Sequence, residues 1–311
     1  MDFEPNDDQR AILEAIEALL ERHAGAARAI ELGRKDAYDT ELDRALADAG
    51  FVALALGPET GLLEATLLVE AVARSGGVVA AGATALVAPA LAGRALAGPV
   101  ALAVAGASDP IRFAAHARTA LVLDGDDARV VPLAPGAAAP VRSSFGFPMG
   151  RLAPDALAGG TSLGPGSGAR LASLWRLALA AEAVGAMRAA LAVTVDYVKR
   201  RRQFGRAIGS FQAVQHRLAE CHVWCDGARW LALEAAFHGA TPERAATAAA
   251  HALAAAGRVF AETHQLSGAM GYTREHDLHV WSMRLAGLRL ELGGVGGHER
   301  AIARARWLGD A

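Results

Sequence analysis

The segment from Tyr197 to Glu220 constrains the fold more than any other part of this 311-residue chain. It holds the end of one helical pattern, a turn with two glycines and the start of a second helical pattern. Gly205 and Gly209 break the first helix, Ser210 is a suitable N-cap, and a helical apolar spacing resumes after it. Cations crowd the end of the first helix, where positive charge offsets the helix dipole. The segment therefore predicts two long helices joined by a basic turn.

Four long helical blocks are expected in the C-terminal half of the chain. Their predicted ranges are 170–202, 210–239, 242–268 and 276–308. Thr241 followed by Pro242 indicates a helix entry, with threonine as N-cap and proline in the first turn. The chain is rich in alanine, the strongest helix former, so the composition favours closely packed helices. Four long antiparallel helices predict a bundle.

The first half of the chain changes character near residue 99. Residues 1–98 show helical apolar stripes, whereas residues 99–165 carry scattered prolines and short apolar runs typical of strands. The expected strands are Val100–Ala105, Ala120–Leu123 and Val130–Leu133, and the glycine-rich stretch 159–168 is expected to be a linker. We therefore predict three domains, with ranges 1–98 (helical), 99–165 (a small β module) and 166–311 (the bundle).

Composition excludes several classes of protein. A net charge of −2 argues against a nucleic-acid-binding protein. The most apolar stretch, 78–93, is shorter than the roughly 20 residues that span a bilayer, and the acidic start does not resemble a signal peptide. Two cysteines cannot make a disulfide framework. We expect a cytoplasmic protein with no membrane or nucleic-acid partner.

Two clusters raise the question of a metal site. Cys221 and Cys225 are four residues apart on a predicted helix, with His216 and His222 close by, so both sulfurs share one face. No second ligand cluster follows at a standard spacing, which favours small core residues over a metal site. The segment Glu275–His279 is better explained as the start of the next helix, so no metal is predicted.

The turn after Tyr197 resembles the R-x-x-F-G…F-Q segment of the acyl-CoA dehydrogenases, FAD-dependent enzymes that introduce a double bond into acyl-CoA thioesters. The matching residues are Arg201, Phe204, Phe211 and Gln212. In that family the arginine and phenylalanine reach across a subunit interface to a neighbour's FAD. The resemblance implies a mostly α fold, with an N-terminal helical domain, a middle β domain and a C-terminal four-helix bundle. The middle module of this chain is much shorter than the family's barrel.

A second segment resembles the family's Q-x-x-G-G-x-G-(F/Y)-T motif. Its matching residues are Gln265, Gly268, Ala269 and Gly271. The resemblance implies that small residues at a helix end let the backbone approach the adenosine diphosphate part of FAD closely. Ala269 replaces the usual second glycine. The segment 42–74 also resembles the family's N-terminal signature.

The family's catalytic base is a glutamate that removes the α-proton of the thioester, and a buried glutamate with a raised pKa suits this work. The resemblance places it either nine residues after Arg284 or ten residues before Gly185. Those positions hold Gly293 and Trp175. Glu291 and Glu182 lie nearby, but a nearby glutamate is more often a surface residue. No catalytic residue is therefore assigned.

Residues 99–165 also lack the family's T-E-P-x-x-G-S loop and W-I-T strand, which face the flavin. Some family members are α2β2 heterotetramers in which one subunit type is degenerate, and this chain resembles that type. The resemblance implies FAD shared with a paralogous subunit that carries the base, an acyl-CoA substrate that is often bulky or steroid-derived, and electron-transfer flavoprotein or a similar acceptor. Two alternatives stay open: a self-sufficient homomer using Glu291 or Glu182, and a non-catalytic scaffold.

Overall fold

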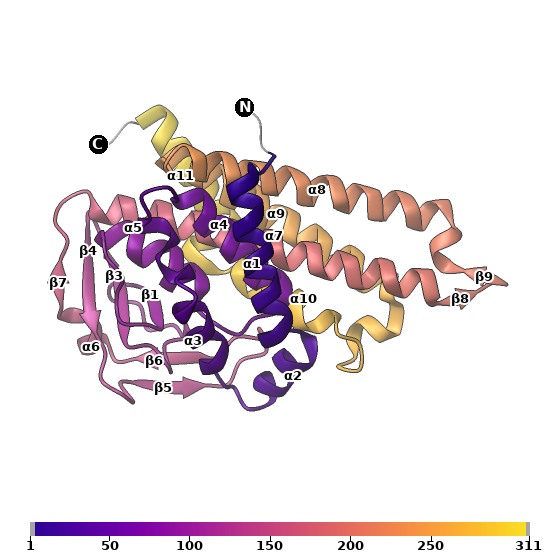
Figure 1. Ribbon diagram of the computed structural model, residues 1–311, viewed down its shortest axis with the longest axis horizontal. Coiled ribbons are helices and arrows are strands. Elements are labelled where there is room, and N and C mark those ends of the chain that lie inside the picture. The colour runs from indigo at the N-terminus through magenta and orange to yellow at the C-terminus, as the bar shows by residue number, and fades with distance from the viewer. Residues whose placement is uncertain (1–3, 309–311) are drawn as a thin grey trace.

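A computed structural model describes residues 4–308 and shows helices at both ends of the chain, with strands between them (Figure 1). Residues 1–3 of the acidic start lie outside the described range. The N-terminal helices are α1 (Asp7–His23), α2 (Ala26–Arg34), α3 (Thr40–Asp48), the 3-10 helix η1 (Phe51–Leu56), α4 (Leu62–Ser75), the π-helix η2 (Gly82–Val87) and α5 (Ala88–Ala92).

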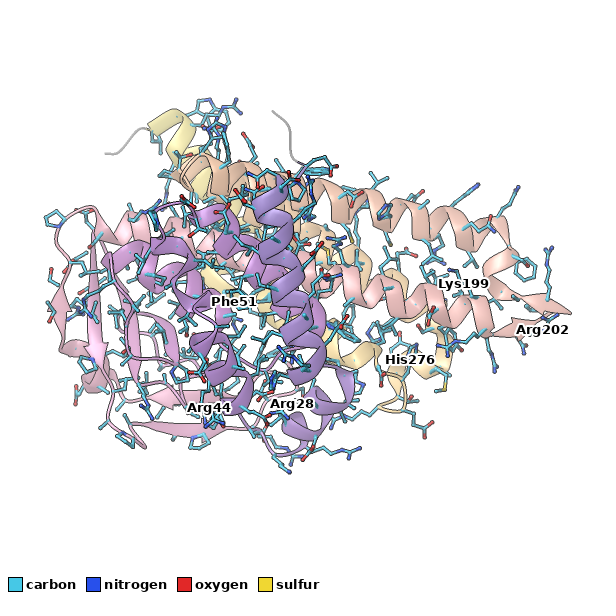
Figure 2. The ribbon with its side chains drawn as sticks, in the orientation of Figure 1. Arg28, Arg44, Phe51, Lys199, Arg202 and His276 are labelled. Carbon is cyan, nitrogen blue, oxygen red and sulfur yellow. The ribbon has the colours of Figure 1, made fainter. Side chains whose placement is uncertain are left out.

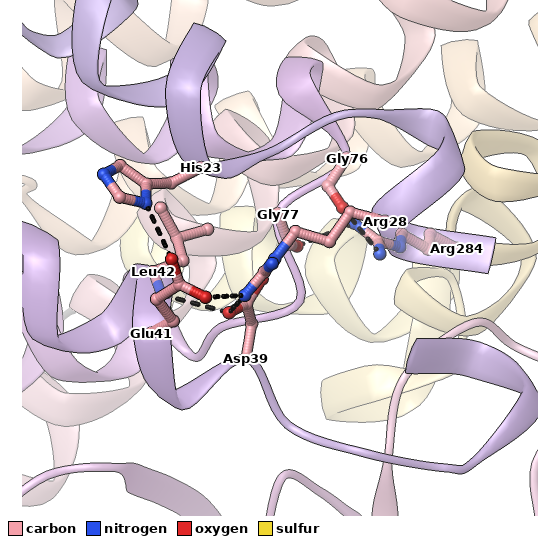
Figure 3. A network of polar contacts seen from close by, with 8 residues as sticks. All are labelled: His23, Arg28, Asp39, Glu41, Leu42, Gly76, Gly77 and Arg284. Atoms are coloured by element: carbon pink, nitrogen blue, oxygen red, sulfur yellow. Dashed lines mark hydrogen bonds and ion pairs between the residues drawn. The ribbon is translucent and has the colours of Figure 1, made fainter. Parts of the chain in front are cut away.

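The N-terminal helices are fixed at their starts by polar side chains. The Asn6 side chain accepts a hydrogen bond from the Gln9 backbone N–H at 2.8 Å, which caps α1. Buried Asp39 caps α3 in the same way and also accepts hydrogen bonds from Nε and Nη2 of Arg28, at 2.6 and 2.7 Å (Figure 3). This bidentate pair joins α2 to the start of α3, because Asp39 satisfies a helix end and a guanidinium together.

Strands occupy the middle of the chain and form two small sheets. The first sheet has the order β1 (Val100–Val104), β3 (Thr119–Asp124), β4 (Asp127–Pro132) and β7 (Thr161–Ser162). The second sheet has the order β2 (Ile111–Arg112), β6 (Met149–Leu152) and β5 (Ala138–Val141), and the short helix α6 (Pro154–Ala158) follows β6. The three expected strands correspond to β1, β3 and β4. The division into three domains stays a prediction.

Strand pairing and one side-chain hydrogen bond attach the first sheet to the start of the bundle. β1 and β3 are parallel, with Val100 opposite Thr119, and β3 turns directly into antiparallel β4. The segment expected to be a linker contains β7, which pairs with β4 and therefore adds a strand to the sheet. Ser167, the first residue of the next helix, donates from its hydroxyl to Asp127 at 3.1 Å. The sheet is therefore attached to the start of the bundle.

The C-terminal region contains long helices joined by short turns. They are α7 (Ser167–Arg200), the hairpin strands β8 (Arg202–Gln203) and β9 (Arg206–Ala207), η3 (Ile208–Ser210), α8 (Gln212–Phe237), α9 (Pro242–Ser267), η4 (Gly268–Tyr272), α10 (Leu278–Leu288), η5 (Glu291–Gly293), α11 (Gly294–Ala303) and η6 (Arg304–Leu308). The first three predicted helices are confirmed within a few residues. Thr241 precedes Pro242 at the start of α9, as predicted, although its side chain makes no capping bond.

Two local predictions were wrong. The expected helix 276–308 is interrupted, because Leu292, Gly293 and Gly294 have φ angles of 50°, 80° and 64° and so reverse the backbone between α10 and α11. Ser210 does not cap α8. Its hydroxyl donates to the Ala207 carbonyl within the 3-10 turn η3, and Phe211 is the N-cap, with no side-chain bond.

Helix α7 runs through the centre of the molecule and packs against α4, α8, α9 and α10. It is the one described helix long and apolar enough to cross a membrane, and 72% of its most apolar 18-residue window is buried inside the protein. The facing side of α9 is largely alanine, and Ala248, Ala252 and Ala255 are completely buried. Small side chains let α7 and α9 approach closely, so the packing of the core depends on the short distance between these two helices.

The crossing of α4 and α7 depends on Gly185. A Cβ atom there would lie 2.2 Å from the Glu70 carbonyl oxygen and 2.9 Å from the Arg74 nitrogen, both backbone atoms of α4. Gly33 in α2 is a matched control, because a Cβ atom there would meet nothing within 4 Å.

We predict that Gly185→Ala lowers the free energy of unfolding by about 1–3 kcal/mol, because α4 must shift to admit the methyl group. Gly33→Ala should be neutral or stabilise by up to about 1 kcal/mol, because alanine loses less backbone entropy in a helix. Chemical denaturation of both variants tests this. A Gly185→Ala protein as stable as the parent would mean that the two helices are not held at this distance.

Candidate functional site

A pocket of about 980 Å3 lies between the first sheet and the bundle. β1 and the loop before β2 form one wall, and α7 forms another. The loop 141–149 and the segment 287–293 complete the lining. Most of the lining side chains are apolar. The pocket is therefore an apolar space at the junction of the β module and the bundle.

The two positions that correspond to the family's catalytic base both line this pocket. Trp175 lies on α7 and Gly293 lies at the break between α10 and α11. Neither side chain can remove a proton. The pocket therefore has the location of a catalytic site but lacks a base at both expected positions.

Glu182 and Glu291, the two alternative bases, also lie in the pocket. Their side chains are 13% and 18% exposed, so the expectation that they are surface residues was wrong. Seven residues separate Trp175 from Glu182, which is close to two helical turns, so both project from one face of α7. Glu291 reaches the pocket because the chain reverses just after it.

Arg112 binds both carboxylates. Its Nη1 atom donates to Glu182 Oε2 at 2.7 Å, and its Nε atom donates to Glu291 Oε1. The other Glu291 oxygen accepts from the indole N–H of Trp175 at 2.6 Å. Tryptophan at a usual base position therefore positions a displaced glutamate, and Arg112 neutralises much of the charge of the pair. We name these four residues, Arg112, Trp175, Glu182 and Glu291, the Arg112 cluster.

The electrostatics of the Arg112 cluster follow from its burial. Burial raises the pKa of Glu182, and the charge of Arg112 opposes this effect. Burial also disfavours the charged form of Arg112, but the two glutamates raise its pKa above its usual value. Arg112 is therefore a permanent cation at the centre of the cluster.

A second buried arginine lies beside the cluster, on the same phenylalanine ring as Arg112. Arg284 is 3% exposed and donates to the carbonyls of Gly77 and Gly76 at 2.9 and 3.1 Å (Figure 3). Its guanidinium and that of Arg112 both lie over the Phe147 ring, at 5.3 and 4.9 Å from the centroid. Burial lowers the pKa of Arg284 to about 10. Arg284 thereby ties α10 to the end of α4.

The first predicted cofactor-binding segment lies at the other end of α7. Arg201 follows Trp175 by 26 residues, which is roughly 39 Å of helix, so its side chain cannot reach the pocket of its own chain. Figure 2 shows Arg202 on the β8–β9 hairpin, which projects from the far end of the bundle. Phe204 is 90% exposed there, with φ 53°, and its ring lies 6.2 Å from that of Phe211.

The second predicted segment lies at the same end of the bundle. The rings of Tyr197 on α7 and His276 lie 5.2 Å apart, which joins the end of α7 to the loop after η4 (Figure 2). Gly268 has φ 59°, and a Cβ atom at Gly271 would lie 3.0 Å from the His264 carbonyl oxygen, so both positions require glycine. Gln265, Gly268 and Ala269 are exposed. The structure thus brings both segments to one exposed end, which we name the bundle tip.

The polar side chains at the bundle tip are available for binding. Within the described residues, the side chains of Arg201, Gln212 and Gln265 make no hydrogen bond or ion pair. A free guanidinium and two free amides beside exposed glycines fit the pyrophosphate and ribose groups of a dinucleotide. The bundle tip has the donors that such a ligand needs but no enclosing wall of its own.

The two cysteines lie in the core. Cys221 and Cys225 are buried on α8, and burial raises their pKa values to about 11 and 12. Within residues 4–308, no group of three or more histidine, cysteine or acidic side chains is arranged to hold a metal ion.

Sequence reasoning missed Arg112. It lies in a two-residue strand just after Pro110, and it is 70 and 179 residues away from its partners in the chain. No local pattern marks such a residue, because its role depends on contacts that only the folded chain creates. Its apolar neighbours and the prolines nearby gave no functional signal.

Comparisons with known proteins identify relatives of this arrangement. The family model described as "Acyl-CoA dehydrogenase, C-terminal domain" matches residues 170–306. A protein of Mycobacterium tuberculosis named acyl-CoA dehydrogenase IpdE2 is 34% identical, covering 91% of this chain and 92% of that protein. The Mycolicibacterium smegmatis protein of the same name is 31% identical, covering 93% and 95%.

Solved structures share the fold. A variant of the Tcur3481-Tcur3483 steroid ACAD has a TM-score of 0.82 at 25% identity, covering 96% of this chain and 97% of the other. The ChsE4-ChsE5 complex from Mycobacterium tuberculosis has a TM-score of 0.79 at 22% identity over the full length of both chains. These likenesses confirm the predicted fold class.

The raised pKa of Glu182 leads to a prediction about pH. The folded protein holds the Glu182 proton more tightly than the unfolded chain does, so folding takes up a proton above about pH 4.5. We predict that the parent protein loses stability relative to Glu182→Gln as the pH rises from 4.5 towards neutrality. Urea denaturation across this range measures the difference. A stability gap that does not change with pH, or that changes in the opposite direction, contradicts the assignment.

Proposed function

This chain belongs to the acyl-CoA dehydrogenase family, and from that premise we propose that it is the subunit of a heteromeric enzyme that lacks the catalytic base. FAD is the cofactor of the family, and it accepts the hydride that leaves the β-carbon of the acyl thioester. In the proposal, this chain contributes its bundle tip to an FAD held mainly by a paralogous subunit. A carboxylate of that partner removes the α-proton.

The observation that carries the proposal is the Arg112 cluster. Trp175 and Gly293 occupy both base positions, and the two nearby glutamates share one guanidinium. Arg112 holds both carboxylates in place, and its charge offsets part of the rise in pKa that burial gives Glu182, so the pair is directed at Arg112 rather than at a substrate. We therefore infer that no side chain in the pocket of this chain removes the α-proton of the thioester.

The bundle tip supports the second half of the proposal. Its exposed arginine, glutamines and glycines suit the phosphate and sugar groups of FAD, and α7 holds them about 39 Å from the pocket of the same chain. Arg201 would hold a phosphate, and Phe204 would cover an apolar face of the cofactor. Residues arranged in this way serve a site on another chain better than a site on their own.

The remaining parts of the proposal concern partners. We propose an α2β2 assembly with a paralogous acyl-CoA dehydrogenase subunit, located in the cytoplasm. The substrate would be an acyl-CoA with a bulky or steroid-derived acyl group, and electron-transfer flavoprotein or a similar protein would accept the electrons. The name of one structural neighbour, a steroid ACAD, agrees with this substrate class.

One observation favours the alternative of a self-sufficient enzyme. Glu182 is nearly enclosed, and burial raises its pKa, as a catalytic base requires. Its Oε1 atom has no hydrogen-bond partner among the described residues, so one oxygen of this carboxylate is not held by Arg112. A scaffold without flavin remains the third candidate. Measurement of turnover separates the first two.

We predict that Glu182→Gln and Glu291→Gln each leave the turnover of the co-purified complex nearly unchanged. Removing a true base should reduce turnover by several orders of magnitude, because general base catalysis and positioning are lost together. The test is the steady-state rate with an artificial electron acceptor. A loss of that size in either variant, with flavin still bound, would show that this chain carries its own base.

We also predict that Arg201→Ala weakens retention of FAD by the complex about tenfold or more. A charge-assisted hydrogen bond of about 1.5–3 kcal/mol would be lost. Arg200→Ala is the matched control, because Arg200 is 78% exposed and pairs only with Asp196 one turn away. Each complex is dialysed under conditions that remove FAD from the protein, and the FAD that stays bound is then quantified. Equal retention in both variants would remove Arg201 from the FAD site.

A further inference from the structure

We propose that the pocket beside the Arg112 cluster is a second binding site of the assembled enzyme, and that it takes an apolar carboxylic acid. The carboxylate would pair with Arg176, and the carbon skeleton would fill the space between β1 and α7. This inference rests on the proposed function, because it assumes that desaturation occurs at the flavin of the partner subunit. It gives a use to a pocket that has no base.

The size and walls of the pocket suit an apolar ligand with a bulky carbon skeleton. Its volume of about 980 Å3 lies at the upper end of the range for ligand sites, roughly 300–1,000 Å3. Val104 and Leu290 line it and are 40% and 65% exposed. Large apolar side chains at a pocket edge lose contact with water when a ligand covers them, which favours binding.

One cation of the pocket lining is shielded from water and has no ionic partner among the residues that the structure describes. Arg112 pairs with both Glu182 and Glu291, and Asp109 and Arg142 are exposed. Arg176 is the remaining charged residue of the lining. Its Nε atom is buried without a hydrogen bond, and it has no ion-pair partner among residues 4–308.

The surroundings of Arg176 make this arrangement costly without a ligand. Burial lowers its pKa, and no anion compensates for the lost hydration. Buried His298 on α11 lies close enough to Arg176 for the guanidinium charge to act on the imidazole. Neither imidazole nitrogen has a hydrogen-bond partner among the described residues. A carboxylate at Arg176 would supply the missing counter-charge.

The number of donors decides the chemical class of ligand. One guanidinium matches one carboxylate in two parallel hydrogen bonds. The acyl group of a CoA thioester has no carboxylate at its thioester end, so it would leave Arg176 without a counter-charge. The free acid, rather than its CoA thioester, is therefore the ligand that this pocket fits.

The test uses the co-purified complex and a fluorescent probe, 1-pyrenebutyric acid, with the neutral 1-pyrenebutanol as the matched compound. We expect saturable binding of one acid per copy of this chain, and at least about tenfold weaker binding of the alcohol. Arg176→Gln should reduce affinity for the acid to that for the alcohol. Arg200→Gln, at the far end of α7, should leave it unchanged.

A second variant tests the location. Val104→Trp would fill the pocket from its partly exposed edge and should abolish binding of both compounds, with FAD content and turnover unchanged. The proposal is overturned if the acid does not bind saturably, if acid and alcohol bind equally, or if Arg176→Gln binds like the parent. Displacement of the acid by the acyl-CoA substrate at its KM, with loss of turnover in Val104→Trp, would instead show that this is the chain's own substrate site. In that case the proposed function would fail as well.

Discussion

The pairing of Arg112 with Glu182 and Glu291 is the interaction on which the rest of the structure depends. It joins β2, α7 and η5, three segments that are far apart in the sequence and meet only at the pocket. Removing one partner from such a buried group is costly, by about 3–5 kcal/mol, because the remaining charge stays buried without compensation. The same pairing that attaches the β module to the bundle also occupies the two carboxylates that could act as bases.

Helix α7, of 34 residues, holds the pocket and the bundle tip apart. Trp175 and Glu182 line the pocket, and Arg201 follows them by 26 and 19 residues at the bundle tip. These spacings are about 39 and 29 Å of helix, so the two ends cannot serve one small site. An assembly resolves this geometry, because the tip of one chain can complete a site on another chain. The geometry is therefore compatible with an assembly in which chains share sites, as we propose.

Much of this arrangement could be predicted from the sequence, and the features that were missed differ in their physical cause. Thr241 with Pro242, and the glycines after Arg201, are local signals, and the corresponding helix ends formed close to where they were expected. The break at Leu292 has a local signal, because Gly293, Gly294, Gly296 and Gly297 follow it, but the predicted helix 276–308 ran across these glycines. The Arg112 cluster was missed because its members are brought together only by tertiary packing. The roles of the bundle-tip residues are still predictions, since they depend on a second chain.

The flavin content of the protein, expressed alone and together with its paralogous subunit, tests the central claim most directly. The account predicts little FAD in the chain alone and one FAD for each pair of unlike chains in the purified complex, measured by absorbance after denaturation. A yellow and active homo-oligomer with one FAD per chain, obtained from single expression, would contradict it.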